Sequence, residues 1–401
     1  MRRPEYWVLG FVIFLAVGRD FLANGRPLYC RIQEETHFPG LRTLVRNPQR
    51  PYGHPVLDSI QKFNLWRSYP YQAAVFAPIP FSPGEMPGRV MKPLANPGTT
   101  LEEGAGTYRH WLGTDDQGRD IAAGMVSGAR IALQIGSLAV LISLCIGVFF
   151  GAIAGFWGDD RLFVRRGRLW LTLAALPIAW FWAFTTNRWI PESEKTAAFF
   201  LQNIGVFFAI IGLFNLLGGW LSGWPFFEKA VCLPVDLMVM RTIEVFTSIP
   251  RLVFIIAVAA VTPAGQSLWL MVALIGVLSW TGPARFIRGE LLRIRSLDYI
   301  IAVRGLGLSE IRILINHALP NAMQPLWIQL AFSMGTAMLL EASVSFLGYG
   351  GVSFEGKSWG SLLLSARQHT TAWWMAIPPG VALFSVVFSL NLITERWTER
   401  R

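Results

Sequence analysis

The stretch ARFIRGELLRIRSLDYIIAVRGLGLSEIRILINHALPNA, residues 284–322, is the part of the sequence that decides the fold. It is polar and lies between two strongly apolar runs. Arginine outnumbers the acidic residues in it, with Arg285, Arg288, Arg293, Arg295, Arg304 and Arg312 against Glu290, Asp298 and Glu310. Because short cytoplasmic loops of membrane proteins carry an excess of Lys and Arg, we expect this segment to face the cytoplasm between two membrane spans.

Within this segment the residue pattern predicts two short helices with a break between them. An apolar stripe over residues 300–306 predicts the first helix, which Ser296 or Asp298 can cap. Gly305 and Gly307 then end or bend it.

A second amphipathic helix is predicted from about Ser309, and it should stop at Pro320 because proline removes a backbone donor. Such a helix pair is suited to docking in a groove of another protein. A structured loop that only joins two spans explains the same pattern, and the residues alone leave both readings open.

Composition places the whole chain in the membrane class. Hydrophobic residues make up 53% of the 401 positions and charged residues only 15%, against roughly 25% charged in soluble domains. The net charge of +10 comes mostly from arginine, and in a membrane protein such an excess reports topology first. No basic run is interleaved with aromatic residues, so no nucleic-acid partner is predicted.

The N-terminal part divides into an apolar start and a long polar segment. Residues 1–23 are predicted to be a first transmembrane span, apolar from Tyr6 to about Ala23; a signal peptide fits less well, because GRDFLANG offers no small-x-small cleavage site. Residues 24–128 are rich in proline and contain no apolar run, which predicts an extended, turn-rich periplasmic segment.

The second span is predicted over residues 129–157. It carries a small-xxx-small stripe, Gly147, Gly151 and Gly155, of the kind that lets helix backbones approach closely in lipid. The loop after it is rich in arginine and is therefore placed in the cytoplasm.

Residues 158–235 contain two apolar runs, near Leu169–Thr185 and Ala197–Leu221, which predict a hairpin of two spans with interfacial tryptophans at its ends. A surface or re-entrant hairpin is the alternative. Further spans are expected near Asp236–Val261, Ser267–Phe286, Met323–Phe346 and Trp373–Ile393. The sequence thus predicts an all-α polytopic membrane protein with about eight spans and both termini in the cytoplasm.

Residues 298–322 resemble the coupling-loop motif of ABC-importer permeases, which runs Glu-Ala-Ala, three residues, Gly, nine residues, Ile, one residue, Leu-Pro. Ala302, Gly307, Leu319 and Pro320 match it, whereas Ile301, Val303 and His317 depart from it. HWLGTDDQGRD at 110–120, SGARIAL at 127–133, EASVSFLGYG at 341–350 and SWG at 358–360 resemble the dipeptide/oligopeptide/nickel importer family, C-type subunit, oligopeptide/microcin-type subgroup. Residues 158–235 match no part of that family and are interpreted as an insertion.

This resemblance implies a six-span type I ABC-importer permease core, made of residues 129–157 and 236–396, in the bacterial inner membrane. The chain would form a translocation path for peptides or peptide-like solutes and have no catalytic role or cofactor. The implied partners are a second permease subunit in a heterodimer, two ATP-binding subunits, a periplasmic solute-binding protein and membrane lipid. The residues expected to couple to the ATPases are Ile301, Ala302, Val303, Gly305, Gly307, Leu319 and Pro320.

Other candidate sites are weighed on their own residues. Glu341, with Ser343 and Ser345, belongs to EASVSFLGYG, and an acid in a span predicts either a gate or a span-packing role. GVSFEGKS, residues 351–358, fits the P-loop pattern by accident, because no soluble strand–helix context surrounds it.

The acids of TDDQGRD, Asp115, Asp116 and Asp120, have the wrong spacing for a calcium loop and are assigned to turns and caps. The histidines are scattered in the sequence, and no metal site is predicted; they are His37, His54, His110, His317 and His369.

Three rival functions differ in their sequence signals. A secondary transporter is expected to show internal repeats and mid-membrane acids, and a passive channel would not need a coupling-type segment. A membrane-embedded enzyme would need a motif such as HExxH or GxSxG, which the sequence lacks. Co-purification with an ATPase separates these classes.

Overall fold

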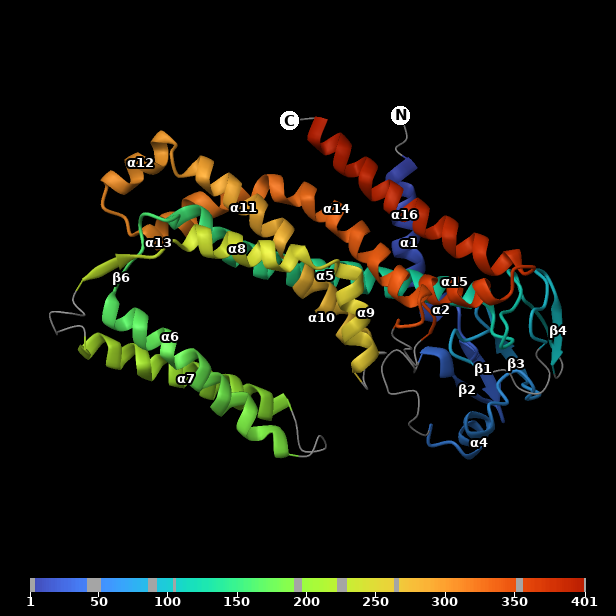
Figure 1. Ribbon diagram of the computed structural model, residues 1–401. Coiled ribbons are helices and arrows are strands. Elements are labelled where there is room, and N and C mark those ends of the chain that lie inside the picture. The colour runs from blue at the N-terminus through green and yellow to red at the C-terminus, as the bar shows by residue number, and fades with distance from the viewer. Residues whose placement is uncertain are drawn as a thin grey trace. The chain divides into compact units, whose positions relative to one another are not determined.

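The computed structural model of the chain describes residues 4–41, 52–85, 92–103, 106–190, 197–221, 229–262, 267–350 and 356–399. The chain forms two compact units, each described by itself below. The first comprises Met1–Phe149, Ile243–Ile287 and Ile315–Arg401, and the second comprises Phe150–Thr242 and Arg288–Leu314. Helices make up most of both units (Figure 1).

Six helical segments of the described residues are long and apolar enough to cross a membrane, and a bent pair of helices adds a seventh candidate. A bilayer core of about 30 Å needs about 20 helical residues. The chain is therefore a mostly helical, multi-span protein, as the sequence predicts. The six segments are Ile121–Trp157, Arg166–Thr185, Leu201–Leu221, Leu268–Ile294, Glu310–Phe346 and Trp373–Thr398.

The first helix is shorter than the span predicted from the sequence. Helix α1 (Pro4–Val17) ends at Gly18, and the short helix α2 (Arg19–Leu22) follows it. Arg19 and Asp20 lie just beyond this break. Their charges would be costly in the apolar layer of the membrane, so the apolar helix ends before them. The predicted count of about eight spans includes α1, which is too short to pass as a span by its length alone.

Helix α5 (Ile121–Trp157) begins ahead of the predicted start at Ala129. The Asp120 carboxylate accepts a hydrogen bond from the Ala123 N–H at 2.7 Å, which satisfies one of the free donors at the start of a helix. Residues 121–128 therefore belong to the helix rather than to the preceding segment. At Gly147 a Cβ atom would lie 2.7 Å from Pro283, so the predicted small-residue stripe does allow a close helix approach there.

The span predicted to run straight through Pro250 is bent instead. Helix α8 (Val235–Ser248) and helix α9 (Arg251–Val261) meet at 72°. Pro250 lacks an N–H and disfavours helical geometry at Ile249, which ends α8 there. Pro250 itself takes an extended conformation as the N-cap of α9.

The helical core of the first unit has two parts. Ile135 of α5, Ile255 of α9 and Ile275 of α10 (Leu268–Ser279) are buried in one cluster. Val12 of α1, Ala129 of α5 and Val386 of α16 (Trp373–Glu399) are buried in the other, together with α14 (Leu319–Phe346) and α15 (Trp359–Gln368). Helix α11 (Thr281–Ile294) continues from α10 and extends into the second unit.

The second helix of the 284–322 segment does not stop at Pro320, contrary to the prediction. Helix α13 (Glu310–Ile313), the wider π-helical turn η4 (Leu314–Ala318) and α14 follow one another in the long segment Glu310–Phe346. A π turn loosens the hydrogen-bond ladder, so the missing N–H of Pro320 is tolerated. The Asn321 side chain donates to the His317 carbonyl at 2.9 Å, which satisfies an acceptor beside the proline.

The segment of the first unit that is predicted to be periplasmic contains small sheets as well as turns, which the all-α prediction does not include. Strands β2–β1–β3 form one sheet and β4–β5 another. The β2–β1–β3 sheet packs with helix α4 around a core of Cys30, Ile32, Leu57, Ile60 and Trp66. The elements are β1 (Tyr29–Ile32), β2 (Glu35–His37), α4 (Pro55–Phe63), β3 (Ala73–Val75), β4 (Thr100–Glu103) and β5 (Gly106–Arg109).

In the second unit, the two ends of the stretch interpreted as an insertion pair with each other. Strand β6 (Phe163–Arg165) pairs antiparallel with β7 (Ala230–Cys232), and Arg165 lies opposite Ala230. Between them α6 (Arg166–Trp180), the turns η1 (Phe181–Thr185) and η2 (Thr186–Trp189), and α7 (Ala197–Leu221) form a helical hairpin. These bounds agree with the two predicted apolar runs.

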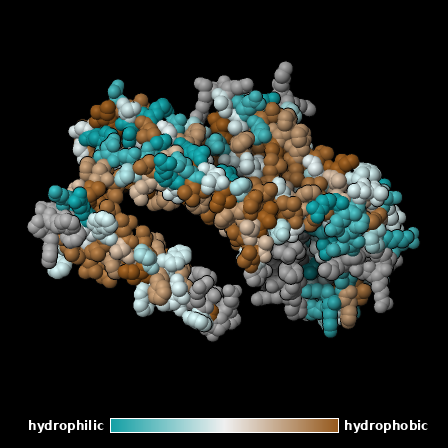
Figure 2. Space-filling view, viewed as in Figure 1, coloured by the Kyte–Doolittle hydropathy of each residue, from teal (hydrophilic) through white to brown (hydrophobic). Residues whose placement is uncertain are grey.

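The hairpin holds itself together and exposes apolar side chains. A Cβ atom at Gly218 of α7 would lie 2.7 Å from the Arg168 backbone of α6, and Asn215 donates to the Thr172 hydroxyl at 3.2 Å. Of an 18-residue apolar stretch within Leu201–Leu221, only 6% is buried inside the protein. Figure 2 shows hydrophobic side chains, in brown, along much of α6 and α7. Trp224, an expected interfacial anchor, lies outside the described residues.

Candidate functional site

The principal candidate site is the helix pair on the arginine-rich segment of the second unit. Helix α12 (Asp298–Gly305) begins after Leu297, which is extended and makes no side-chain cap. Asp298 lies in the first turn, where its charge complements the helix dipole. Ser296 does not cap α12; its hydroxyl donates to the Arg293 carbonyl at 2.8 Å and so closes α11.

A glycine turn separates α12 from α13. Gly307 has φ +79°, a conformation that L-residues with a side chain adopt only at a cost. The Leu306 N–H donates to the Ala302 carbonyl at 3.1 Å, and the Gly307 N–H donates to the Arg304 carbonyl at 3.0 Å. A Cβ atom at Gly305 or Gly307 would meet no described heavy atom of this chain within 4 Å. Both glycines therefore leave open space on the surface.

An ion pair joins the two helices across this turn. Arg304 Nε lies 2.6 Å from Glu310 Oε1, and Arg304 Nη2 lies 3.1 Å from Glu310 Oε2. This hydrogen-bonded pairing raises the pKa of the Arg304 guanidinium, so Arg304 stays charged. The two-point contact fixes the angle between α12 and α13.

The pair is amphipathic in an unusual way, because it exposes apolar side chains. Ile300 and Ile313, both in the second unit, are fully buried. On the other side Ile301, Leu306 and Ile311 are 54%, 79% and 61% exposed. We call the exposed side chains of Ile301, Ala302, Leu306 and Ile311, with Gly305 and Gly307 between them, the coupling surface.

The predicted coupling residues divide between the two units. Ile301, Ala302, Val303, Gly305 and Gly307 all lie on α12 or the turn after it, and Val303 is half-buried. Leu319 and Pro320 lie at the start of α14 in the first unit, where Leu319 is half-buried and Pro320 exposed.

The segment that carries the coupling surface is anchored by residues that the sequence analysis missed. Arg288 of α11 donates two hydrogen bonds to the Asp236 carboxylate of α8, one of them at 2.5 Å. A Cβ atom at Gly155 would lie 2.7 Å from the Arg288 carbonyl, so α5 and α11 cross in contact. Asp236 and Arg288 are far apart in the chain, so no local sequence pattern predicts their pairing.

Asp159 adds a second anchor at the base of α8. Its Oδ1 accepts from the Leu237 N–H at 3.0 Å, and its carbonyl accepts from the Cys232 thiol at 2.8 Å. Nearby, burial lowers the pKa of Arg161, and the positive charges of Arg304 and Arg295 lower it further. The coupling surface is thus bordered by a basic cluster.

A second candidate, Glu341, is sealed inside the first unit. Its side chain is buried, the Ser345 hydroxyl donates to Oε1 at 2.6 Å, and Ser358 is a further hydrogen-bond partner. A Cβ atom at Gly360 would lie 2.4 Å from the Ala342 carbonyl, so α14 and α15 touch through their backbones there. Ser343 does not reach Glu341; its hydroxyl donates to Leu339 O at 2.7 Å.

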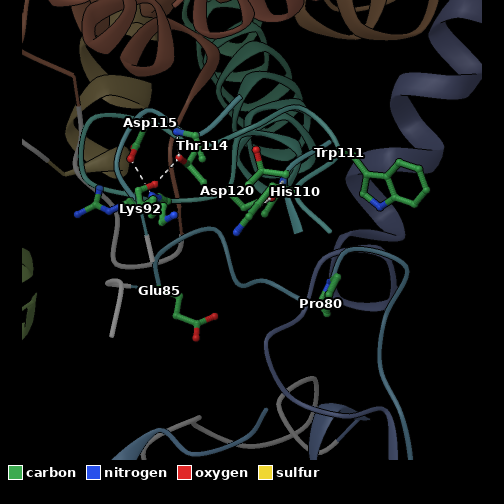
Figure 3. A network of polar contacts seen from close by, with 12 residues as sticks. Pro80, Glu85, Lys92, His110, Trp111, Thr114, Asp115 and Asp120 are labelled. Carbon is green, nitrogen blue, oxygen red and sulfur yellow. Dashed lines mark hydrogen bonds and ion pairs between the residues drawn. The ribbon is translucent and has the colours of Figure 1, made fainter. Parts of the chain in front are cut away.

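The TDDQGRD turn forms a polar network with α15, part of which is drawn in Figure 3. Asp115 Oδ1 accepts from the Gln117 and Arg119 N–H groups at 2.9 and 2.8 Å, and Asp115 Oδ2 pairs with Lys357 at 2.5 Å. Asp120 Oδ2 lies 2.7 Å from His110 Nδ1. The turn and cap roles predicted for Asp115 and Asp120 are confirmed.

This network also bears on the accidental P-loop pattern at 351–358. Residues 351–355 of the pattern lie outside the described residues. Its lysine, Lys357, pairs with Asp115, and its serine, Ser358, is the N-cap of α15, accepting from the Ser361 N–H. Both side chains are engaged in structural contacts within the first unit.

Comparison with known proteins bears directly on this fold and site. Residues 233–400 match the family described as binding-protein-dependent transport system inner membrane component. This range covers α8 to α16, including α12 and α13.

Three relatives extend the similarity. A putative peptide permease protein of Brucella suis biovar 1 is 27% identical over 292 residues, which cover 72% of this chain and 71% of the relative. The peptidoglycan transport system permease protein YejE of Agrobacterium fabrum is 24% identical over 413 residues, covering 97% and 85%. The inner membrane ABC transporter permease protein YejE of Escherichia coli K12 is 25% identical over 401 residues, covering 98% and 90%.

Proposed function

Since residues 233–400 match the family of binding-protein-dependent transport system inner membrane components, we propose that this chain forms a path for peptides or peptide-like solutes. It is a multi-pass permease of the inner membrane and a non-catalytic component of an ATP-driven importer. The proposed substrate class rests on relatives named as a peptide permease and a peptidoglycan transport permease. Muropeptide-like solutes fall within that class.

In the proposed assembly the chain pairs with a second permease subunit, and two ATP-binding subunits dock on the cytoplasmic side. A solute-binding protein delivers substrate to the periplasmic segment, residues 24–128. The core consists of residues 129–157 and 236–396, with 158–235 as an inserted hairpin of two peripheral spans. Both termini lie in the cytoplasm.

The observation that supports the coupling role is that the exposed apolar coupling surface lies on a helix pair held in place by ion pairs. Leu306 is 79% exposed at the tip of the turn, and large exposed apolar side chains in a cluster mark interaction sites. The Arg304–Glu310 and Arg288–Asp236 pairs brace the segment, so a push on α12 passes to α11 and α8. Closure of the ATPases would thus move the spans as rigid bodies.

For Glu341 we propose a span-packing role rather than a gate. The Glu341 side chain is buried and held by Ser345 and Ser358 between touching helices, which favours packing over contact with a solute. Its removal should loosen α14 against α15 instead of changing selectivity.

The test uses Gly307→Glu in the full complex, with uptake and ATP hydrolysis measured in proteoliposomes. We expect the complex to assemble but uptake to be lost, because a charged side chain would stand on an apolar docking surface. Gly307→Ala adds only the backbone strain of φ +79°, about 1–2 kcal/mol, so it should retain most uptake.

Gly289→Glu is the matched control for charge, since Gly289 is exposed on α11 and a Cβ atom there would meet no described atom within 4 Å. Normal uptake by the Gly307→Glu complex would refute the coupling assignment. Uptake driven by an ion gradient without the ATPases would instead support a secondary transporter.

A further inference from the structure

Three side chains of the kinds that bind metal ions meet in the extramembrane part of the first unit. Glu35 and His37 lie on β2, and His54 is the residue before α4. One ligand atom from each of the three lies within 4.8 Å of the others. His37 Nε2 is 3.6 Å from Glu35 Oε2, and the two imidazole rings are 5.0 Å apart, centre to centre.

Two ring nitrogens in this cluster are buried without a partner. His37 Nε2 and His54 Nδ1 have no hydrogen bond within the part of the chain that the structure describes. Buried polar atoms are almost always paired, so each such atom calls for an explanation. His54 is in N-cap position yet makes no side-chain cap bond, which leaves its ring available for another partner.

The fold holds these three side chains in place from two directions. Glu35 and His37 are two residues apart on a strand and therefore project from the same face. They lie opposite Ile32 and Cys30 of β1, both buried in the core that also contains Leu57 of α4. That shared core fixes β2 relative to the start of α4, so the cluster is not a chance meeting of mobile side chains.

We propose that Glu35, His37 and His54 form a binding site for a divalent transition-metal ion, with Zn²⁺ as the best fit. Two imidazoles and one carboxylate are an established zinc ligand set that leaves the fourth position for water or another ligand. With Zn–N distances of about 2.0–2.1 Å, tetrahedral ligand atoms lie roughly 3.3 Å apart. Glu35 Oε2 already lies 3.6 Å from His37 Nε2, close to this separation, and all three ligand atoms lie within 4.8 Å of one another.

The ligand types select against other ions. Mg²⁺ and Ca²⁺ prefer all-oxygen sites, whereas imidazole suits Zn²⁺, Ni²⁺ and Cu²⁺. Cys30 is fully buried in the neighbouring core and does not belong to the cluster of described residues, so the site takes no thiolate. Metal bound here would link β2 to α4 and stabilise the extramembrane segment, because binding to the folded state adds to folding stability.

The test uses the full chain purified in detergent, stripped with a chelator and titrated with Co²⁺ and then Zn²⁺. We expect one equivalent of Co²⁺ to give the visible absorbance of a low-symmetry site and to be displaced by Zn²⁺. His37→Gln and His54→Gln should each weaken Zn²⁺ binding about tenfold or more. Zn²⁺ should raise the melting temperature of the wild type more than that of these variants.

Glu35→Gln and His369→Gln complete the design. Glu35 is exposed, so Glu35→Gln keeps the fold while removing a charged ligand, and its affinity should fall as well. His369 lies at the end of α15, away from the cluster residues, and His369→Gln should bind like the wild type. Absence of a stoichiometric site, or binding unchanged in all three cluster variants, would overturn the proposal.

Discussion

Lys357 and Asp115 come from distant parts of the sequence and form an ion pair at 2.5 Å. The Asp115 side chain is 1% exposed and that of Lys357 is 15% exposed. Asp115 is also held by two backbone N–H groups of its own turn. Lys357 therefore neutralises a carboxylate that the turn would otherwise bury with its charge unbalanced.

We expect Lys357→Met to lower the free energy of unfolding by about 1–3 kcal/mol, less than for a fully buried pair because the backbone bonds to Asp115 remain. Thermal unfolding of the purified chain in detergent measures this, with Lys62→Met as a control at an exposed lysine. ATP hydrolysis by the assembled complex should be unchanged. Loss of nucleotide binding in Lys357→Met would contradict the structural role of this lysine.

At this scale the sequence predicted some side-chain roles and could not predict others. The roles of Asp115 and Asp120 follow from local turn chemistry, because their partners lie within a few residues. The Glu35–His37–His54 cluster is invisible as a motif, since tertiary packing brings β2 to the start of α4. The same reason hides the Arg288–Asp236 pair that anchors the coupling surface.

Among the elements, the β6–β7 pair determines how the α6–α7 hairpin is attached. Arg165 and Ala230 lie opposite one another, so the chain leaves and returns at a single point. The Arg166 N–H also donates to the Lys229 carbonyl at 3.0 Å, which adds one more backbone hydrogen bond between the two ends of the hairpin. An insertion joined in this way can be added to a helical core without moving the helices before and after it.

We therefore expect that replacing residues 166–229 by Asn-Gly leaves an assembled and active importer. Asn-Gly favours the two-residue turn that matches an antiparallel pair such as Arg165 and Ala230. Since little of α7 is buried inside the protein, uptake should stay near the wild-type rate. Uptake and complex yield are measured side by side.

Deleting α7 alone is the control for this experiment. It removes one crossing and would place the arginine-rich 285–312 segment on the wrong side of the membrane, so uptake should be abolished. If the 166–229 replacement assembled but failed to transport, the hairpin would belong to the translocation path or its gating.

Helix type and approximate position could be predicted from apolar runs, whereas breaks within helices could not. The runs at 169–185 and 197–221 correspond to α6 with η1 and to α7. Pro250 bends a span by 72°, yet Pro320 lies inside a continuous one, and both prolines follow an apolar stretch. The difference lies in the π turn η4 and the Asn321 side chain, which relieve Pro320 and have no counterpart recognisable in sequence.

For the whole molecule, the contacts between the chain ends constrain the topology. Arg396 of α16 pairs with Glu5 of α1, and Trp397 Nε1 donates to the Tyr6 hydroxyl at 3.2 Å. The start of α1 and the end of α16 thus lie at the same face, side by side in Figure 1. Two ends at one face require an even number of crossings.

An even number of membrane crossings favours α1 as a span, although the length of α1 alone does not. The six long segments and the bent pair make seven candidates among the described residues, and α1 makes eight. Together α1 and α2 cover Pro4–Leu22, which approaches the length needed to cross. With eight spans, the proposed topology has the arginine-rich segment and both termini on the cytoplasmic side, which the positive-inside bias favours.

This arrangement predicts the side on which the connector between α6 and α7 lies. Ser193 is in that connector and lies outside the described residues. In a chain without its native cysteines, Ser193→Cys should react with a membrane-impermeant thiol reagent added to the periplasmic side of spheroplasts. Ser309→Cys, before α13, is the control and should react only after the membrane is opened. Labelling of Ser193→Cys only in opened membranes would place the connector inside, and α6 and α7 would then have to lie along the surface or re-enter it.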